Sequence, residues 1–194
     1  RWANDFTVSK GGGAYITGVR DGAGYDGYIL KYGPILSQEW TQTISSPFAD
    51  SGEHIEIDDA GNIYVMGTTN SPHANTPFQG LSNKGSYDIF ISKYNSSGVN
   101  LWNRLLGAEG WKHDYIEATA IDSTGAIYIA GSTNGNLDNN LNKGDSDILV
   151  AKFNSLGEKV WSKTIGTSSY DSAYAITSGR SNSIYISGST RGNL

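Results

Sequence analysis

The sequence predicts an all-β fold, a β-propeller or part of one, built from four-stranded antiparallel blades. Three observations predict it: an internal repeat, short strands separated by turns rich in Gly and Asp, and strands that are apolar on both faces. A β-branched and aromatic run that ends in glycine occurs four times, at Gly18, Gly67, Gly131 and Gly188. A second repeated block follows only the first three copies, so we expect three full blades and the first two strands of a fourth.

The elements of one blade can be followed in the third copy. A short first strand at 118–121 contains small alanines, as expected of innermost strands that converge on an axis. Asp and Gly in 122–125 permit a tight turn, and the glycine-ended run forms the second strand. A loop of variable length comes next, at 132–143 in this copy.

The second half of each blade is the repeated block itself. The third strand, 147–153 in the third copy, carries apolar residues on both faces, which indicates that both faces are covered. A turn of the type Asn-x-x-Gly leads into a fourth strand that contains a tryptophan. We therefore expect one repeat domain over residues 1–194, with blade repeats at about 3–49, 50–112 and 113–169 and an incomplete one at 170–194.

Two residue types recur at fixed places in the second block, where each Trp follows its Asp by fourteen residues. A ring of carboxylates could bind calcium, but we favour a structural role in which each Asp accepts backbone N–H groups of the preceding glycine turn. The tryptophans could stack on sugars, but we favour packing between neighbouring blades. These structural positions are Asp26, Asp88 and Asp147, and Trp40, Trp102 and Trp161.

Two sites depart from the repeat and are our speculative ligand-binding positions. His54 and Glu56 lie on a first strand where the third and fourth copies have alanine. With Asp58 they would face one side of the strand, as a metal or polar-ligand site or as the wall of a solvated channel near the axis. The other site is Trp111, which has no counterpart in the other copies and is followed by His113 and Asp114.

Composition excludes several classes of function. The net charge is −5 and no basic stripe is present, so we expect no nucleic-acid partner. The absence of cysteine excludes disulfides, thiol catalysis and cysteine-ligated metals. No apolar run approaches the roughly 18 residues of a membrane span. No hydrolase, phosphate-binding or dinucleotide motif is present, so we expect no catalytic residues, no bound metal and no cofactor.

The repeat resembles a known bacterial family. The order Asp-turn-Gly, Ile-Tyr-x-x-Gly, loop, Gly-x-x-Asp, Lys-Tyr/Phe-Asn-x-x-Gly and Trp is similar to the beta-propeller repeat abbreviated SBBP, and to long arrays of it in marine cyanobacterial proteins. The resemblance covers nearly the whole chain. It implies a propeller in secreted or surface-associated bacterial proteins, and it implies no catalytic residues.

These observations predict a non-catalytic structural or binding module of a bacterial extracellular or surface protein. Recognition would fall on the variable loops 19–25, 68–84 and 132–143, with a protein or carbohydrate as the partner. The chain starts at Arg1 without a signal peptide and carries half a blade at its end, so we expect a piece of a longer propeller, or self-association through the incomplete blade. Two alternatives are a lectin-like carbohydrate binder and a metal-assisted enzyme at His54 and Glu56.

Overall fold

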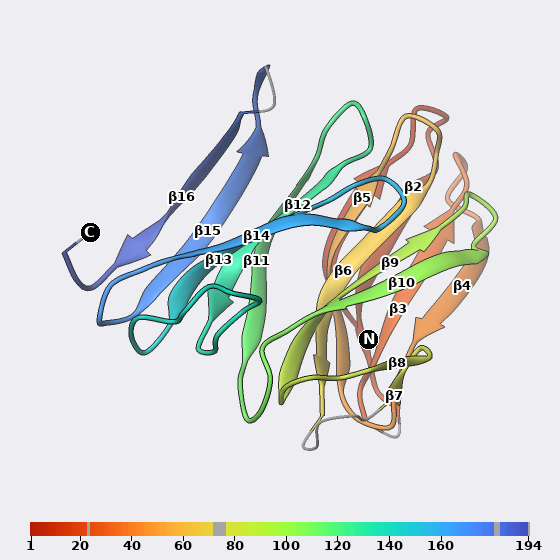
Figure 1. The fold of residues 1–194 in the computed structure, drawn as a ribbon. Helices are drawn as coiled ribbons and strands as arrows, with labels where there is room; N and C mark the ends of the chain where they lie inside the picture. The colour runs from red at the N-terminus through yellow and green to blue at the C-terminus, as the bar shows by residue number, and fades with distance from the viewer. Residues whose placement is uncertain (23, 72–76, 181–182, 194) are drawn as a thin grey trace.

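The computed structural model describes residues 1–22, 24–71, 77–180 and 183–193 as three four-stranded antiparallel sheets, a two-stranded sheet and a short hairpin. Pro72 of the second variable loop and Leu194 lie outside the described residues. The sheets lie side by side from the N-terminal sheet to the C-terminal hairpin and do not close into a ring (Figure 1). The predicted all-β architecture of a partial propeller is confirmed.

Each sheet is formed by consecutive strands of one repeat. The first sheet contains β1 (Trp2–Val8), β2 (Ala14–Arg20), β3 (Asp26–Tyr32) and β4 (Gln38–Ile44). The second contains β5 (Asp50–Ile57), β6 (Ile63–Asn70), β9 (Tyr87–Tyr94) and β10 (Asn100–Leu106), and a hairpin of β7 (Pro77–Phe78) and β8 (Leu81–Ser82) lies in its long loop. The third contains β11 (Asp114–Ile121), β12 (Ile127–Thr133), β13 (Asp147–Phe153) and β14 (Lys159–Ile165), and the fourth contains β15 (Asp171–Ser178) and β16 (Ile184–Thr190).

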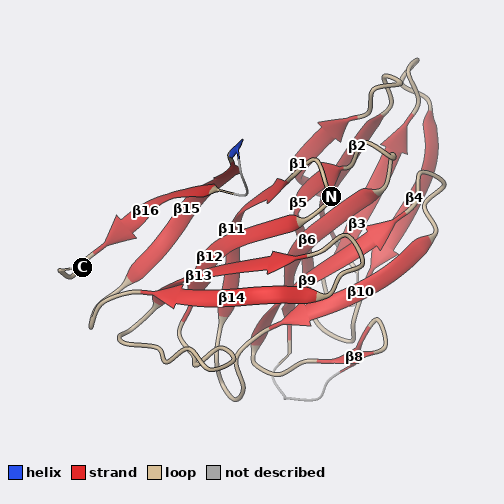
Figure 2. Ribbon diagram, turned by 45° about the horizontal axis from the view of Figure 1, so that its top comes forward, coloured by secondary structure: helices blue, strands red, loops and turns tan. Residues whose placement is uncertain are grey.

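The first strand of each repeat is the innermost one. Strand β5 contacts β1 and β11, and β11 contacts β15, so the inner strands of successive sheets meet one another. The outer strands β4, β10 and β14 lie at the opposite edge of their sheets, as Figure 2 shows for β10 and β14. Small side chains suit this convergence, and Ala173 on β15 is fully buried.

The two faces of each central strand enter different hydrophobic cores. Phe90 of β9 packs with Ile29 of the first sheet, whereas Ile89 and Ile91 pack with Ile127 of the third sheet. Every sheet-to-sheet junction therefore has a core of its own. This double burial is the reason that the central strands lack an alternating polar face.

The repeated glycines lie inside the second strands rather than at their ends. We predicted loops beginning directly after Gly67 and Gly131, but β6 continues to Asn70 and β12 to Thr133. Each glycine faces a β-bulge in the first strand, where the register shifts by one residue. A Cβ at Gly131 would overlap the carbonyl oxygen of Tyr115, so only glycine fits this close approach.

The variable loops and the sheet-to-sheet connections emerge at one end of every sheet. In each four-stranded sheet the first and third strands start here, and the second and fourth strands finish here. We call this side of the molecule the loop face. It carries the described parts of the loops 20–26 and 70–87, the loop 133–147, and the connections 44–50, 106–114 and 165–171. No helix in the described part of the chain is long and apolar enough to cross a membrane.

Candidate functional site

The repeated tryptophans lie between sheets. A Cβ at Gly98 would be 3.0 Å from the ring of Trp40, and one at Gly157 would be 3.0 Å from the ring of Trp102. Each tryptophan therefore covers the glycine turn of the following sheet, and the indole Nε1 of Trp40 donates to the carbonyl oxygen of Ser96 at 3.3 Å. These contacts use the ring faces for packing inside the molecule.

A repeated Lys, Tyr and turn Asp accompany the tryptophan. The Lys93 ammonium lies 4.6 Å from the ring centroid of Tyr64, and the Tyr64 hydroxyl donates to the Asp58 carboxylate at 3.1 Å. Burial raises the pKa of Asp58, but hydrogen bonds from Asn62 and Tyr64 outweigh it and hold this pKa below its ordinary value. Asp58 thus belongs to the turn. The third repeat has the same bond from Tyr128 to Asp122 at 3.1 Å.

Asp88 and Asp147 are fully buried at the starts of the third strands and accept hydrogen bonds from the backbone. Asp88 accepts from the N–H groups of Lys84 at 2.6 Å and Gly85 at 3.0 Å, and Asp147 accepts from that of Lys143 at 3.0 Å. Asp26 differs, because its partner is the guanidinium of Arg20 at 3.3 Å.

Asp114 occupies a position that recurs in the repeat, although the alignment of the repeat copies did not identify it. Asp50, Asp114 and Asp171 each precede the repeat glycine by seventeen residues, and all three are buried at the start of a first strand. Asp114 accepts from the backbone N–H of Ala108 at 2.8 Å. Burial raises the pKa of Asp114 to about 6, against a lowering effect of the neighbouring Thr133 hydroxyl. The equal spacing from the glycine was the signal that would have identified this position.

His54 and Glu56 lie on the inner strand β5, half-buried. Glu56 accepts from the Thr119 hydroxyl of β11 at 3.2 Å, which links two neighbouring inner strands. Burial lowers the pKa of His54, and burial raises the pKa of Glu56. Asp58 is held in its turn, so the three side chains make separate contacts. Within the described residues, no group of three or more His, Asp or Glu is arranged to hold a metal ion.

A third acidic side chain on β5, Glu53, was not singled out by the sequence comparison. It accepts from the Thr68 hydroxyl at 2.5 Å. Burial, with a smaller contribution from the nearby Glu117 charge, raises the pKa of Glu53 to about 7. The carboxyl of Glu53, on the inner strand of the second sheet, therefore changes its protonation state near neutral pH.

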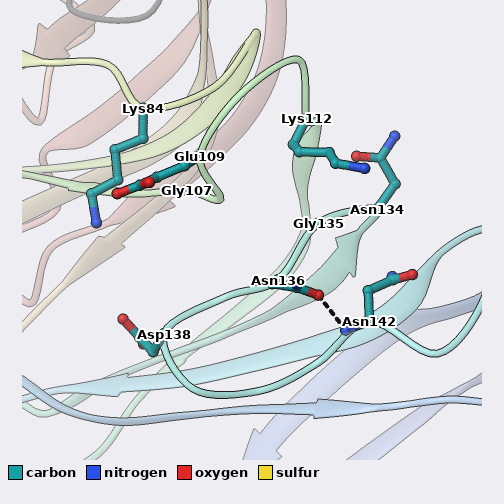
Figure 3. Close-up of a pocket in the computed structure, with 9 residues that line it drawn as sticks. All are labelled: Lys84, Gly107, Glu109, Lys112, Asn134, Gly135, Asn136, Asp138 and Asn142. Atoms are coloured by element: carbon teal, nitrogen blue, oxygen red, sulfur yellow. Dashed lines mark hydrogen bonds between the residues drawn. The ribbon is translucent and has the colours of Figure 1, made fainter.

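The loop face carries a polar cleft between the second and third sheets (Figure 3). Its volume is about 570 Å³. Side chains of both charges and several amides line it: Lys84, Glu109, Lys112, Asn134, Asn136, Asp138 and Asn142, with the backbone of Gly107 and Gly135.

The loop 133–147 forms one wall of this cleft and is held by its own hydrogen bonds. The backbone N–H of Asn142 donates to the Asn136 side chain at 2.9 Å, which Figure 3 marks. Lys159 lies 2.5 Å from the Asp138 carboxylate, so this negative charge is already paired. Lys84, Glu109 and Lys112 form the facing wall and remain available to a ligand with polar or charged groups.

Trp111 and His113, predicted as candidates, both lie on the loop face beside this cleft. Trp111 is 72% exposed, and Lys112 between them lines the cleft. The backbone N–H of His113 donates to the Asn134 side chain at 2.8 Å, and its ring nitrogen Nδ1 lies 2.9 Å from the Tyr115 hydroxyl. The sequence alone did not bring these residues together with the loop 133–147.

Comparisons with known proteins agree with the repeat architecture. The family model "Beta-propeller repeat", SBBP, matches residues 39–72 and 101–138. The chain is 27% identical over 143 residues to the regulatory protein FlaEY of Caulobacter vibrioides, which covers 69% of this chain and 15% of that protein. It is 29% identical over 114 residues to an uncharacterized WD repeat-containing protein of Acanthamoeba polyphaga mimivirus, covering 55% of this chain and 8% of that protein.

Among solved structures, the tail fiber of Staphylococcus aureus phage P68 is similar over 91% of this chain and 43% of its own, with a TM-score of 0.28 and 10% identity. This likeness is too distant to bear on function. The chain also spans only a small part of both sequence relatives. The two family matches and the repeated sheets lead to one conclusion: this chain carries beta-propeller repeats of the SBBP family.

Proposed function

We propose that this chain is a non-catalytic structural and binding module of a bacterial extracellular or surface protein, and that it binds its partner on the loop face. The observation that carries the proposal is the polar cleft between the second and third sheets. Its walls come from loops whose length varies between repeats, while the sheets beneath them repeat. Such a division between a constant scaffold and variable loops is typical of binding modules.

The chemistry of the cleft supports recognition rather than catalysis. Its amides and its lysine and glutamate side chains offer hydrogen bonds and charges of both signs to a polar partner. The extracellular setting rests on the resemblance to the SBBP repeat family, which implies a secreted or surface-associated protein. A partner on the cell surface, protein or carbohydrate, suits such a cleft.

The test is binding of the fluorescently labelled chain to washed bacterial cells, measured by flow cytometry with increasing protein concentration. The variant Lys84→Glu/Lys112→Glu reverses both positive charges of the cleft. We expect saturable binding of the wild-type chain and a loss of at least about tenfold in apparent affinity for the variant, because two charge contacts are replaced by repulsion.

A matched control reverses two exposed cations in turns at the end of the sheets opposite the loop face, Lys10→Glu/Arg180→Glu. This control has the same net charge as the cleft variant and should bind like the wild type. Equal binding by the cleft variant and the wild type, or equal losses in both double variants, would refute a specific role of the cleft.

A further inference from the structure

We propose that the inner part of the loop face binds an extended neutral polysaccharide, whose sugar rings enter two equivalent aromatic hollows on consecutive repeats. This inference rests on the proposed binding role and names the class of ligand. The first hollow belongs to the second sheet and has a volume of about 150 Å³. The second hollow belongs to the third sheet and has a volume of about 270 Å³.

The two hollows are built from the same positions of the repeat. Residues on both sides of Asp50 line the first hollow, and residues on both sides of Asp114 line the second. Each hollow is also lined by the residues one and three places after the repeat glycine, the latter being Asn70 and Asn134. The residue directly before the repeated Asp of the third strand, Tyr87 or Ser146, completes the match. The repeat therefore presents the same recess twice, as a ligand with its own repeating unit requires.

Aromatic rings separate and flank the hollows. Tyr25 lines the first hollow on its outer side and Tyr170 lines the second, and they are 53% and 38% exposed. Tyr87 lines the first hollow, and its ring centroid lies 5.1 Å from that of His113 and 5.6 Å from that of Tyr115, which both line the second. Along the loop face the order is thus aromatic wall, hollow, aromatic wall, hollow, aromatic wall.

The wall and the hollow together match a sugar ring. The face of an aromatic ring carries partial negative charge and attracts the weakly positive C–H groups on one side of a pyranose. The second hollow is lined by the amide of Asn134, which can donate, and by the carboxylate of Asp145, which can only accept. Sugar hydroxyl groups both donate and accept hydrogen bonds, so they can satisfy both side chains. Among the described residues no Lys or Arg lines either hollow, although the Arg191 guanidinium lies 5.5 Å from the centroid of the Tyr170 ring. The carboxylates of Asp50 and Asp145 do line the hollows, which argues for a neutral rather than an anionic chain.

A proline-rich peptide is the other extended ligand that aromatic grooves bind. Its backbone presents carbonyl acceptors and, at proline, no N–H donor. The Asp145 carboxylate accepts hydrogen bonds only, so a proline backbone offers it no donor. A polysaccharide satisfies this carboxylate with a hydroxyl, and we therefore commit to the sugar.

The experiment is isothermal titration calorimetry of the full chain with cellohexaose, chitohexaose and xylohexaose, each beside its disaccharide, and with a decaproline peptide. We expect at least one hexasaccharide to bind, and to bind at least about tenfold more tightly than its disaccharide because it reaches both hollows. Tyr115→Ala and Tyr170→Ala should each weaken binding by about two- to tenfold, the effect of losing one aromatic stacking contact.

Three further variants separate ring stacking from general damage. Tyr170→Phe retains the ring and should bind within about twofold of the wild type. Tyr185→Ala removes an exposed tyrosine of β16 that pairs at the turn end of its sheet, away from the loop face, and should leave binding unchanged. Thermal unfolding of each variant verifies that it is folded.

The outcomes distinguish this inference from the proposed function. Absence of binding by all three hexasaccharides up to about 10 mM, the range of very weak complexes, overturns the polysaccharide. Binding of decaproline alone overturns it as well, in favour of a peptide. Equal affinity of Tyr115→Ala and the wild type overturns the hollows as the site. In each case cell binding that still depends on Lys84 and Lys112 would leave the proposed function standing.

Discussion

The buried carboxyl of Asp114 makes a prediction about how stability depends on pH. Its side chain is fully buried at the start of β11, and burial raises its pKa to about 6 from 3.8. The variant Asp114→Asn keeps the shape of the side chain and an oxygen that can accept from the Ala108 N–H, but it removes the charge. We expect this variant to be more stable than the wild type at alkaline pH and equally stable at acidic pH.

The sign and size follow from the difference between the folded and unfolded states. In the unfolded chain Asp114 titrates near 3.8, so folding at intermediate pH takes up a proton, and this contribution is present below about pH 4 and lost as the pH rises through about 6. An increase in pKa from 3.8 to about 6 corresponds to about 3 kcal/mol, at about 1.4 kcal/mol for each tenfold change. Asp114→Asn should therefore raise the free energy of unfolding by up to about 3 kcal/mol at pH 8.

Urea denaturation followed by tryptophan fluorescence at several pH values between 4 and 8 measures this effect. Asp59→Asn is the control, because Asp59 is exposed in a turn and pairs with exposed Lys10, and a surface pair of this kind contributes less than about 1 kcal/mol. The reasoning is refuted if Asp114→Asn destabilises the protein at pH 8, or if its difference from the wild type is the same at pH 4 and pH 8.

Three other variants test the repeat and its inner strands. Gly131→Ala should lower the free energy of unfolding by at least about 2 kcal/mol, because the added Cβ overlaps the Tyr115 carbonyl oxygen. Gly11→Ala, in an open turn, should change it little, and equal effects of the two variants in urea denaturation would contradict the argument that the bulge requires glycine. Trp102→Ala should lower the free energy of unfolding by about 2–3 kcal/mol, and by more than Trp161→Ala, since Trp102, unlike Trp161, covers the glycine turn of a following sheet in the described part of the chain; the reverse order in thermal unfolding would count against packing between sheets. Glu53→Gln should stabilise the protein above about pH 7 and have little effect below about pH 5, because burial raises the pKa of Glu53; a pH-independent difference would disprove it.

Much of the fold could be predicted because the repeat states each element more than once. Two repeated blocks predicted the strand order, and the apolar faces of 147–153 predicted burial on both sides, as the separate cores show. The ends of the second strands could not be read in the same way. A glycine is a common strand terminator, and only the bulge in the opposite strand shows why the chain continues past Gly67 and Gly131.

The candidate site was predicted less well. Trp111 and His113 drew notice because they break the repeat, and they lie on the loop face. Asp114 beside them follows the repeat, which became clear once Asp50 and Asp171 were seen at the same buried position. The loop residues Asn134 and Asn142 gave no signal, because amides are common in any turn and reveal nothing about which loops meet.

By itself the sequence determined the repeat, the four-stranded units and the all-β class, because these depend on local patterning and on which faces of a strand are apolar. Only the tertiary structure decided where the variable loops come together. Sheets that stack side by side bring Lys84 and Asn134 to one cleft, and they place Tyr87 against His113 and Tyr115 between two hollows. Such neighbourhoods arise from packing between repeats, whose geometry no single stretch of chain encodes.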